Sequence, residues 1–203
     1  RYAGMTYLAT DNAMSCRSNP ASLLAGCQSI VVVGLAYSHP QPNHPPVFGV
    51  PRGKVSSYAW GEDYHPVIHE LLEKFAHRLK NLIRESFNYR IFTDSGPLLE
   101  KALAQRAGLG WIGKNGCLIN PEYGSFFFLG ELLLNIKLER SLPFSADRCG
   151  RCRKCIENCP TKCILPNRTI DAGRCISYLT IENKDEIPLE LRPALGNWIF
   201  GCD

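Results

Sequence analysis

Four cysteines in the segment CGRCRKCIENCP constrain this chain more than any other feature of its sequence. Spacings of two, two and three residues let one tight loop place three thiolates at the corners of an iron–sulfur cubane, while the fourth thiolate turns away toward a second cluster. The four are Cys149, Cys152, Cys155 and Cys159, and Pro160 follows at once. The segment therefore predicts 4Fe-4S binding and makes electron transfer the leading hypothesis for function.

The remaining cysteines predict a second cluster whose ligands lie only partly within this chain. Two 4Fe-4S clusters need eight cysteine ligands, and only Cys163, Cys175 and Cys202 lie downstream of the first run. One cluster would take Cys149, Cys152 and Cys155, and the other would take Cys159, Cys175 and Cys202. Each cluster then lacks one ligand, so we expect the natural protein to continue past Asp203 with at least two more cysteines.

Two other uses of cysteine fit the sequence less well. A structural zinc site usually takes its ligands as two separated pairs, unlike this run. A disulfide framework suits small secreted chains, whereas 203 residues with 45% hydrophobic content can bury a core without such cross-links. Four cysteines are not spaced like metal ligands, and we expect them to be buried or incidental thiols. They are Cys16, Cys27, Cys117 and Cys163. Unpaired cysteines and iron–sulfur chemistry both favour a reducing cytoplasm.

Basic residues gather around the predicted cluster loops. Between Arg140 and Arg174 there are eight Lys or Arg against three acidic residues, a local excess of +5 in a chain whose net charge is +4. Such a patch can neutralise phosphates, and it can equally be a solvated face or the counter-charge of anionic clusters. The sequence predicts no membrane span, because the apolar run at 29–37 is too short and FFFLGELLL carries Glu131 in its middle.

Hydrophobic periodicity predicts an α/β body before the cysteine-rich module. Apolar residues recur at helical spacing between Tyr64 and Phe87, which predicts an amphipathic helix that covers a sheet. These residues are Ile68, Leu71, Leu72, Phe75, Leu79 and Leu82. The other predicted elements are strands at 29–38 and 88–94, a loop at 39–46, and a helix at 97–108 with Pro97 in its first turn. Segments 117–120 and 125–134 are also apolar, and the sequence does not decide whether they form helices or strands. We expect the boundary between the α/β body and the cysteine-rich module near Leu142.

The glycines of GLGWIG match the GxGxxG pattern of dinucleotide-binding loops, but their context differs. That motif requires a strand before it and a helix that starts within it, whereas here a predicted helix comes first. Gly108 is better explained as the left-handed residue that ends this helix. Gly110 and Gly113 would let the backbone approach another part of the molecule closely.

Six segments carry a family resemblance. They are SYAWGEDYH, FTDSGPLLEKALAQRAGLGWIGKN, NPEYGSFFFLGE, CGRCRKCIENCPT, RCISYLTIE and LRPALGNWIFGCD. In this order they resemble epoxyqueuosine reductase, the cobalamin-dependent iron–sulfur family of queuosine biosynthesis in tRNA. The resemblance covers nearly all of the chain, which departs from the family in lacking residues before Arg1 and after Asp203. It implies a nitroreductase-like cobalamin-binding α/β (α+β) domain at 1–142 and a ferredoxin-like, two-cluster iron–sulfur module at 143–203.

The resemblance also implies a reaction, the reduction of epoxyqueuosine to queuosine in tRNA. Removing the epoxide oxygen needs two electrons and protons, and low-valent cobalt beside low-potential clusters can supply the electrons. By resemblance Asp94 is the proton donor, since a carboxyl held against an apolar corrin face stays protonated and can act as a general acid. From the residues alone, Asp94 or Ser95 could equally be the N-cap of the following helix.

A cobalamin-binding set follows from the same resemblance. The set is Arg17, Ser56, Asp94, Lys114, Asn115, Leu118 and Leu129. Without the resemblance, the charged members would be solvated surface residues and the leucines would be core residues. The five histidines are scattered over the predicted loop and helix, so we expect no histidine ligand to cobalt.

Two other function classes remain open. A reductive dehalogenase-like enzyme would share the clusters and the corrin pocket, but RCISYLTIE and LRPALGN favour the queuosine enzyme. A ferredoxin-like electron carrier would not need the long α/β sequence that precedes the clusters. The expected partners are tRNA carrying epoxyqueuosine and an external electron donor, for a monomeric cytoplasmic protein that binds no membrane.

Overall fold

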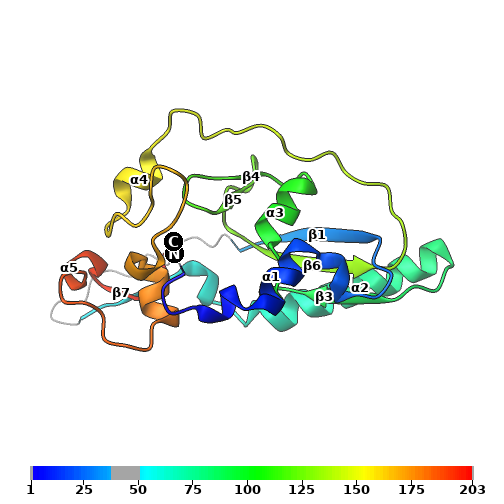
Figure 1. The fold of residues 1–203 in the computed structure, drawn as a ribbon, viewed down its shortest axis with the longest axis horizontal. Helices are drawn as coiled ribbons and strands as arrows, with labels where there is room; N and C mark the ends of the chain where they lie inside the picture. Colours follow the sequence, from blue (N-terminus) through cyan, green and yellow to red (C-terminus); the bar gives the residue numbers. More distant parts are fainter. Residues whose placement is uncertain (1, 38–50, 203) are drawn as a thin grey trace.

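The computed structural model describes residues 2–37 and 51–202. Its helices are α1 (Asp11–Ser18), α2 (Tyr64–Ile83), α3 (Glu100–Arg106), α4 (Lys154–Asn158) and α5 (Arg192–Leu195). Its strands are β1 (Ser29–Ala36), β2 (Lys54–Val55), β3 (Tyr89–Phe92), β4 (Trp111–Ile112), β5 (Leu118–Ile119), β6 (Phe127–Leu134) and β7 (Trp198–Phe200). Figure 1 shows the main sheet and α2 toward one end of an elongated molecule, and α5 and β7 at the other. The predicted loop at 39–46, with His39 and His44, lies outside the described residues.

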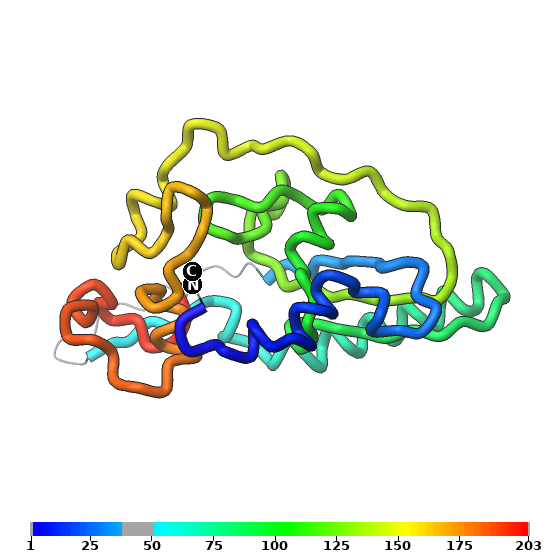
Figure 2. The backbone as a smooth tube through the Cα atoms, in the orientation of Figure 1, coloured from blue at the N-terminus to red at the C-terminus, as the bar shows by residue number. Residues whose placement is uncertain are grey.

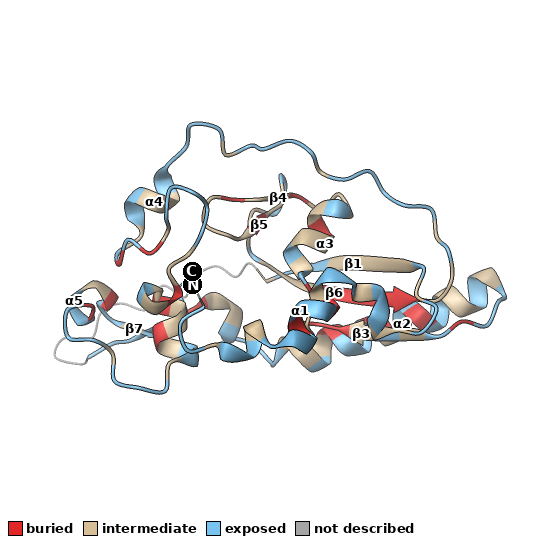
Figure 3. Cartoon of the chain, viewed as in Figure 1, coloured by how far each residue is buried: buried red, intermediate tan, exposed pale blue. Residues whose placement is uncertain are grey.

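A three-stranded antiparallel sheet with the order β1-β6-β3 organises the N-terminal part. β6 is the middle strand, so Leu132 pairs with Val31 on one side and with Ile91 on the other. The second half of β6 is buried on both faces (Figure 3), which explains why its sequence is apolar at consecutive positions rather than at alternating ones, with Glu131 as the exception. Both strand predictions are confirmed with shorter bounds, and the open segment 125–134 contains a strand.

Helix α2 packs on one face of this sheet. Ile68, Leu72 and Ala76 are buried in a cluster with Leu132 and Leu134. Burying each leucine contributes roughly 1.5–3 kcal/mol, so this contact is a major stabilising feature of the N-terminal part.

The predicted helix at 64–87 is confirmed, with an end at Ile83 where Arg84 adopts a left-handed φ of 53°. The predicted apolar face was too wide. Leu71, Phe75 and Leu82 are exposed, because the sheet contacts the row of residues spaced by four that begins at Ile68.

The opposite face of the sheet is covered by α3 and the turn before it. Phe92, Leu98 and Leu133 form a second buried cluster, with Leu103 packed against it. The helix begins at Glu100, so the predicted start at Pro97 was wrong. The chain first makes a tight turn in which the Leu98 N–H donates to the Gly96 carbonyl, 2.8 Å away.

The glycine-rich segment forms a small β4–β5 hairpin after α3. Gly108 has a φ of 88°, which confirms its predicted role as the left-handed end of the helix. A Cβ atom on Gly110 would lie 2.1 Å from the Ile119 carbonyl oxygen, so the predicted close backbone approach is also confirmed. A strand lies inside the motif and no helix begins there, which agrees with the prediction against a dinucleotide fold.

The chain between β6 and α4 has neither helix nor strand, and Figure 2 shows it as a long arc over the outside of the molecule. A third buried cluster then forms from Ile176, Leu179, Leu191 and Leu195. β7 pairs in parallel with β2, so a segment from the N-terminal part joins the cysteine-rich part. None of the helices within 2–37 and 51–202 has the length and apolar character needed to cross a bilayer.

Candidate functional site

Asp94 lies just after β3 in a backbone conformation that is unusual for a residue with a side chain. Its φ is 49°, and its N–H donates to Glu100 Oε1 at 2.6 Å. The preceding Thr93 is buried and donates its hydroxyl to the Leu129 carbonyl at 2.8 Å, which fixes the end of the strand. Left-handed non-glycine residues are costly and concentrate at functional sites. The geometry therefore marks Asp94 as a candidate functional residue.

The alternative role of Asp94 as a helix N-cap is excluded by the structure. The N-cap of α3 is Leu99, and no side chain makes a capping hydrogen bond there. Ser95 likewise lies too early in the chain to cap a helix that begins at Glu100. Asp94 therefore does not cap α3, which would be the simplest structural role for an aspartate just before a helix.

Tyr64 orients the Asp94 carboxylate, and no sequence pattern had singled out this tyrosine. Its hydroxyl donates to Asp94 Oδ2 at 2.7 Å. Its ring stacks on Phe128 with a centroid distance of 4.1 Å and an interplanar angle of 9°. Burial, together with the hydrogen bond to Asp94, raises the pKa of Tyr64 well above its usual range, so the phenol stays a neutral donor. The one available signal was the position of Tyr64 in SYAWGEDYH.

Two further carboxyl groups lie near Asp94. Glu131 in β6 is 0% exposed, and its carboxyl group lies against that of Glu100. Burial, with a further contribution from the nearby Glu100 carboxylate, raises the pKa of Glu131 to about 9. Burial likewise raises the pKa of Glu100. At neutral pH Glu131 therefore holds a proton beside Glu100, the residue that binds the Asp94 backbone.

Asp94 and Arg17 line one cavity of about 590 Å³. Much of its wall is apolar and comes from Leu8, Pro97, Leu98, Leu99 and Ile112. Arg17 also donates a hydrogen bond to the Leu8 carbonyl, which holds the guanidinium at this wall. An apolar wall with two acids, Asp94 and Glu100, and two basic residues, Arg17 and Lys101, suits a large, mostly apolar ligand that bears polar substituents.

The other predicted cobalamin-binding residues lie outside the lining of this cavity. Leu118 is buried in β5, and Leu129 in β6 offers its carbonyl to Thr93. Asn115 accepts a hydrogen bond from the Cys117 N–H at 3.2 Å. Ser56 is 1% exposed next to β7, and its hydroxyl has no hydrogen-bond partner within residues 2–37 and 51–202. Contacts of these residues with cobalamin stay predictions.

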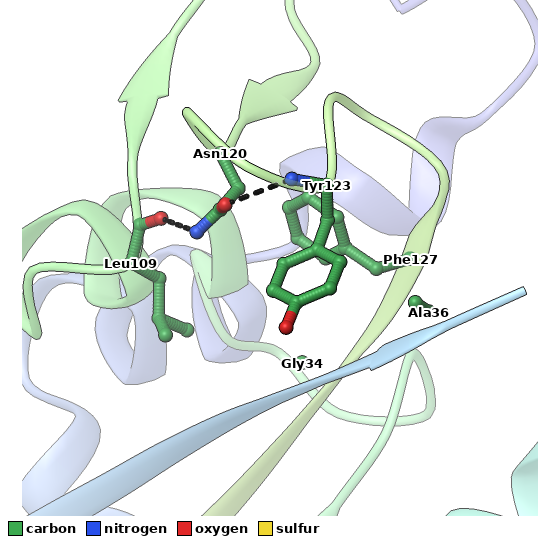
Figure 4. A pocket seen from close by; sticks show the side chains of 6 residues that line it. All are labelled: Gly34, Ala36, Leu109, Asn120, Tyr123 and Phe127. Atoms are coloured by element: carbon green, nitrogen blue, oxygen red, sulfur yellow. Dashed lines mark hydrogen bonds between the residues drawn. The ribbon is translucent and has the colours of Figure 1, made fainter. Parts of the chain in front are cut away.

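A second cavity, of about 310 Å³, lies between β1 and the loop after β5 (Figure 4). Tyr123 and Phe127 point into it, opposite Gly34 and Ala36. The Asn120 amide donates to the Leu109 carbonyl at 2.7 Å and its oxygen accepts from the Tyr123 N–H at 3.1 Å. Because those bonds engage the amide, the cavity presents a mainly apolar lining.

The first cluster loop is held by the β4–β5 hairpin. Trp111 donates its indole N–H to the Cys149 sulfur, with Nε1 and Sγ 3.4 Å apart. Lys114 donates to the carbonyls of Gly150 and Cys152 at 2.7 and 2.8 Å. The predicted cobalamin residue Lys114 therefore contacts the cluster loop. A donor to sulfur and a nearby cation are both suited to an anionic iron–sulfur cluster.

Among the described residues no three Cys, His, Asp or Glu side chains are grouped as metal ligands, and of the second predicted set Cys159 and Cys175 each contact Cys163 instead. Cys163 is buried, as expected, and its sulfur lies 3.5 Å from that of Cys159. A hydrogen bond with Cys163 lowers the pKa of Cys175 to about 6. The same bond raises the pKa of Cys163, so Cys175 is the thiolate of the two. Cys202 is exposed just after β7. The chemistry fits a metal-binding thiolate at Cys175.

Comparison with known families gives two matches along the chain. The family model described as "Epoxyqueuosine reductase QueG, DUF1730" matches residues 17–95. The model described as "4Fe-4S double cluster binding domain" matches residues 148–203.

Curated relatives carry the same name. An epoxyqueuosine reductase of Pseudomonas aeruginosa is 44% identical over 200 residues, which cover 98% of this chain and 55% of the relative. An epoxyqueuosine reductase of Escherichia coli is 45% identical over 188 residues, which cover 92% of this chain and 49% of the relative. The chain thus spans about half the length of these relatives.

Solved structures of epoxyqueuosine reductases are also similar to this chain. A crystal structure of epoxyqueuosine reductase with an epoxyqueuosine-modified tRNA-Tyr stem loop has a TM-score of 0.87 and 37% identity, covering 94% of this chain and 50% of that one. The Streptococcus thermophilus enzyme has a TM-score of 0.85 and 38% identity, with the same coverage. A Bacillus subtilis structure, in which a catalytic aspartate loop is swung out of the active site, has a TM-score of 0.84 and 37% identity.

Proposed function

Because this chain belongs to the epoxyqueuosine reductase family, we propose that the complete protein reduces epoxyqueuosine to queuosine in tRNA. The chain covers about half of its relatives, so the activity is that of the whole protein. The observation that carries the proposal is Asp94, which is held in a strained conformation at the rim of the cavity it shares with Arg17. The modified stem loop bound by a relative supports tRNA as the substrate.

The cofactors follow from the two parts of the chain. The double-cluster domain at 148–203 binds 4Fe-4S clusters, and the proposed ligands within the chain are Cys149, Cys152, Cys155, Cys159, Cys175 and Cys202. For cobalamin, the apolar wall of the 590 Å³ cavity fits a corrin face, and Arg17 fits its polar substituents. When bound, cobalamin would supply a low-potential reductant, and the clusters would deliver electrons to it.

Asp94 is the residue of the chain to which we assign proton transfer. Loss of the epoxide oxygen as water with formation of the alkene consumes two electrons and two protons. Asp94 would act as the general acid that gives the first proton to the departing oxygen, and the second proton would come from solvent. Tyr64 would orient the carboxyl through its hydroxyl, and Glu100 would hold the Asp94 backbone through its carboxylate. The mobile catalytic aspartate loop of the Bacillus subtilis relative supports an acid on a loop of this kind.

The remaining assignments concern the protein as a whole. We propose a nitroreductase-like cobalamin-binding domain at 1–142 and a ferredoxin-like module at 143–203. We further propose a cytoplasmic monomer that receives electrons from an external donor. The basic excess between Arg140 and Arg174 would contribute to binding the tRNA phosphates.

The proposal is tested on the full-length protein, purified without oxygen and reconstituted with iron, sulfide and cobalamin. The protein is incubated with reductant and tRNA carrying epoxyqueuosine, and nucleoside mass spectrometry follows the loss of one oxygen. We expect conversion by the wild type and at least 100-fold slower conversion by Asp94→Ala.

The matched control is Asp185→Asn, which changes an exposed aspartate that does not line the cavity and should convert substrate normally. Iron and cobalamin contents are measured in every variant. Loaded wild-type protein that leaves the substrate unchanged would refute the assigned reaction. Normal conversion by loaded Asp94→Ala would refute only the role of Asp94.

A further inference from the structure

We propose that Trp111 sets the reduction potential of the cluster bound through Cys149, by donating its indole N–H to the cysteine sulfur. The inference rests on the proposed role of Cys149 as a cluster ligand. It gives a function to the glycine-rich segment GLGWIG, which neither the general acid nor the cluster motif explains. Trp111 would act on the electron supply and not on the substrate.

The indole is aimed at the sulfur by its surroundings. Its ring stacks on Phe144, with centroids 5.7 Å apart and an interplanar angle of 29°. The indole N–H is a donor only, so it needs an acceptor, and Cys149 Sγ lies 3.4 Å from it. The backbone of β4 is fixed by its pairing with β5, where Trp111 lies opposite Ile119. The donor thus approaches the sulfur from a rigid hairpin.

The cluster loop is fixed from its own side as well. The Cys149 N–H donates to Asp147 Oδ1 at 3.0 Å, and Asp147 also pairs with Arg168. Lys114, three residues after Trp111, donates to the carbonyls of Gly150 and Cys152. One short hairpin therefore provides both an N–H to the sulfur and a cation to the loop that carries it.

The same hairpin reaches the catalytic cavity. Ile112, the residue after Trp111, lines the cavity that contains Asp94. Neighbouring residues of a strand point to opposite faces, so β4 has one side chain toward the cavity and the next toward the cluster ligand. Trp111 is thus located between the source of electrons and the site that uses them.

The direction of the effect follows from charge. Reduction adds one negative charge to a cluster that already carries thiolates, and a hydrogen bond to a ligand sulfur stabilises the more negative state. The Trp111 N–H should therefore raise the potential. Its loss should make one-electron reduction on the order of tenfold less favourable, a downward shift of ~59 mV.

The test is a redox titration of the full-length, reconstituted protein, followed by electron paramagnetic resonance. Trp111→Phe keeps an aromatic ring against Phe144 and removes the N–H donor together with part of the ring. We expect one of the two cluster signals to titrate at a lower potential, and the other to stay unchanged. Cys149→Ser identifies the affected signal, because that signal should be lost or altered when its ligand is replaced.

Trp60→Phe is the matched control, since it makes the same substitution at an indole whose N–H donates to the Val55 carbonyl. It should leave both potentials unchanged. Unchanged potentials in Trp111→Phe with both clusters present would overturn the inference and leave the ligand assignment intact. An equal shift in Trp60→Phe would also overturn it, because the shift would then not depend on the hydrogen bond to Cys149. Two unaltered signals in Cys149→Ser would remove the ligand assignment itself.

Discussion

Replacing Glu131 by glutamine should stabilise this protein increasingly as the pH rises. Glu131 is 0% exposed in the middle strand of the sheet, opposite Val32 and Phe92. Burial, and then the charge of Glu100, raise its pKa from 4.5 to about 9. The folded protein thus binds this proton more tightly than the unfolded chain. Its stabilising contribution is complete below pH 4.5 and is lost as the pH rises through 9.

The magnitude follows from the shift in pKa. Each unit between the two pKa values corresponds to about 1.36 kcal/mol. Between pH 4.5 and pH 7 the folded state therefore loses about 3 kcal/mol because Glu131 must keep its proton. Glutamine has the same shape without an ionisable proton, so Glu131→Gln should avoid this loss. At pH 7 the gain of about 3 kcal/mol should appear as a higher unfolding temperature.

The assay is thermal unfolding of the full-length, cluster-loaded protein without oxygen at pH 5, 7 and 8.5. The difference between Glu131→Gln and wild type should be small at pH 5 and should grow at each higher pH. Glu122→Gln, at an exposed carboxylate, is the matched control and should show no such trend. A difference that is independent of pH, or a loss of stability at every pH, would refute the reasoning that Glu131 is protonated in the folded protein.

Three further changes test the geometry around Asp94 and in the hairpin. Tyr64→Phe removes the hydroxyl donor to the Asp94 carboxylate, so conversion of epoxyqueuosine should slow roughly 10-fold or more at unchanged iron content; a wild-type rate would contradict it. Glu100→Ala removes the acceptor for the Asp94 N–H and should slow conversion by a similar factor in the same assay, whereas Glu100→Gln keeps an acceptor and should restore most of the rate. Gly110→Ala would place a methyl group 2.1 Å from the Ile119 carbonyl oxygen and should destabilise the protein by about 1–3 kcal/mol in thermal unfolding, an effect that Gly61→Ala, with open space around the new methyl group, should not share.

Local patterns predicted much of the secondary structure. The spacing of apolar residues located α2, and short apolar runs located β1 and β3, because these elements are built from near neighbours in the chain. The segment that forms β6 was recognised only as apolar. The patterns failed where packing decided the outcome. Leu71 and Phe75 match the helical period but face solvent, and α3 begins later than Pro97 suggests because the preceding residues form a turn that fills the space over the sheet.

The features of the candidate site can likewise be separated into those that the sequence predicted and those that only the packing revealed. The spacing of the cysteines by itself determined the 4Fe-4S hypothesis, since three ligands within one loop are set by short-range chain geometry. No spacing indicates that Tyr64 donates to Asp94, thirty residues away. The tertiary structure alone also decided that Trp111 donates to Cys149, and that Glu131 lies buried near Glu100. Each of these contacts joins side chains from different elements, and only the packing of those elements sets the distance between them.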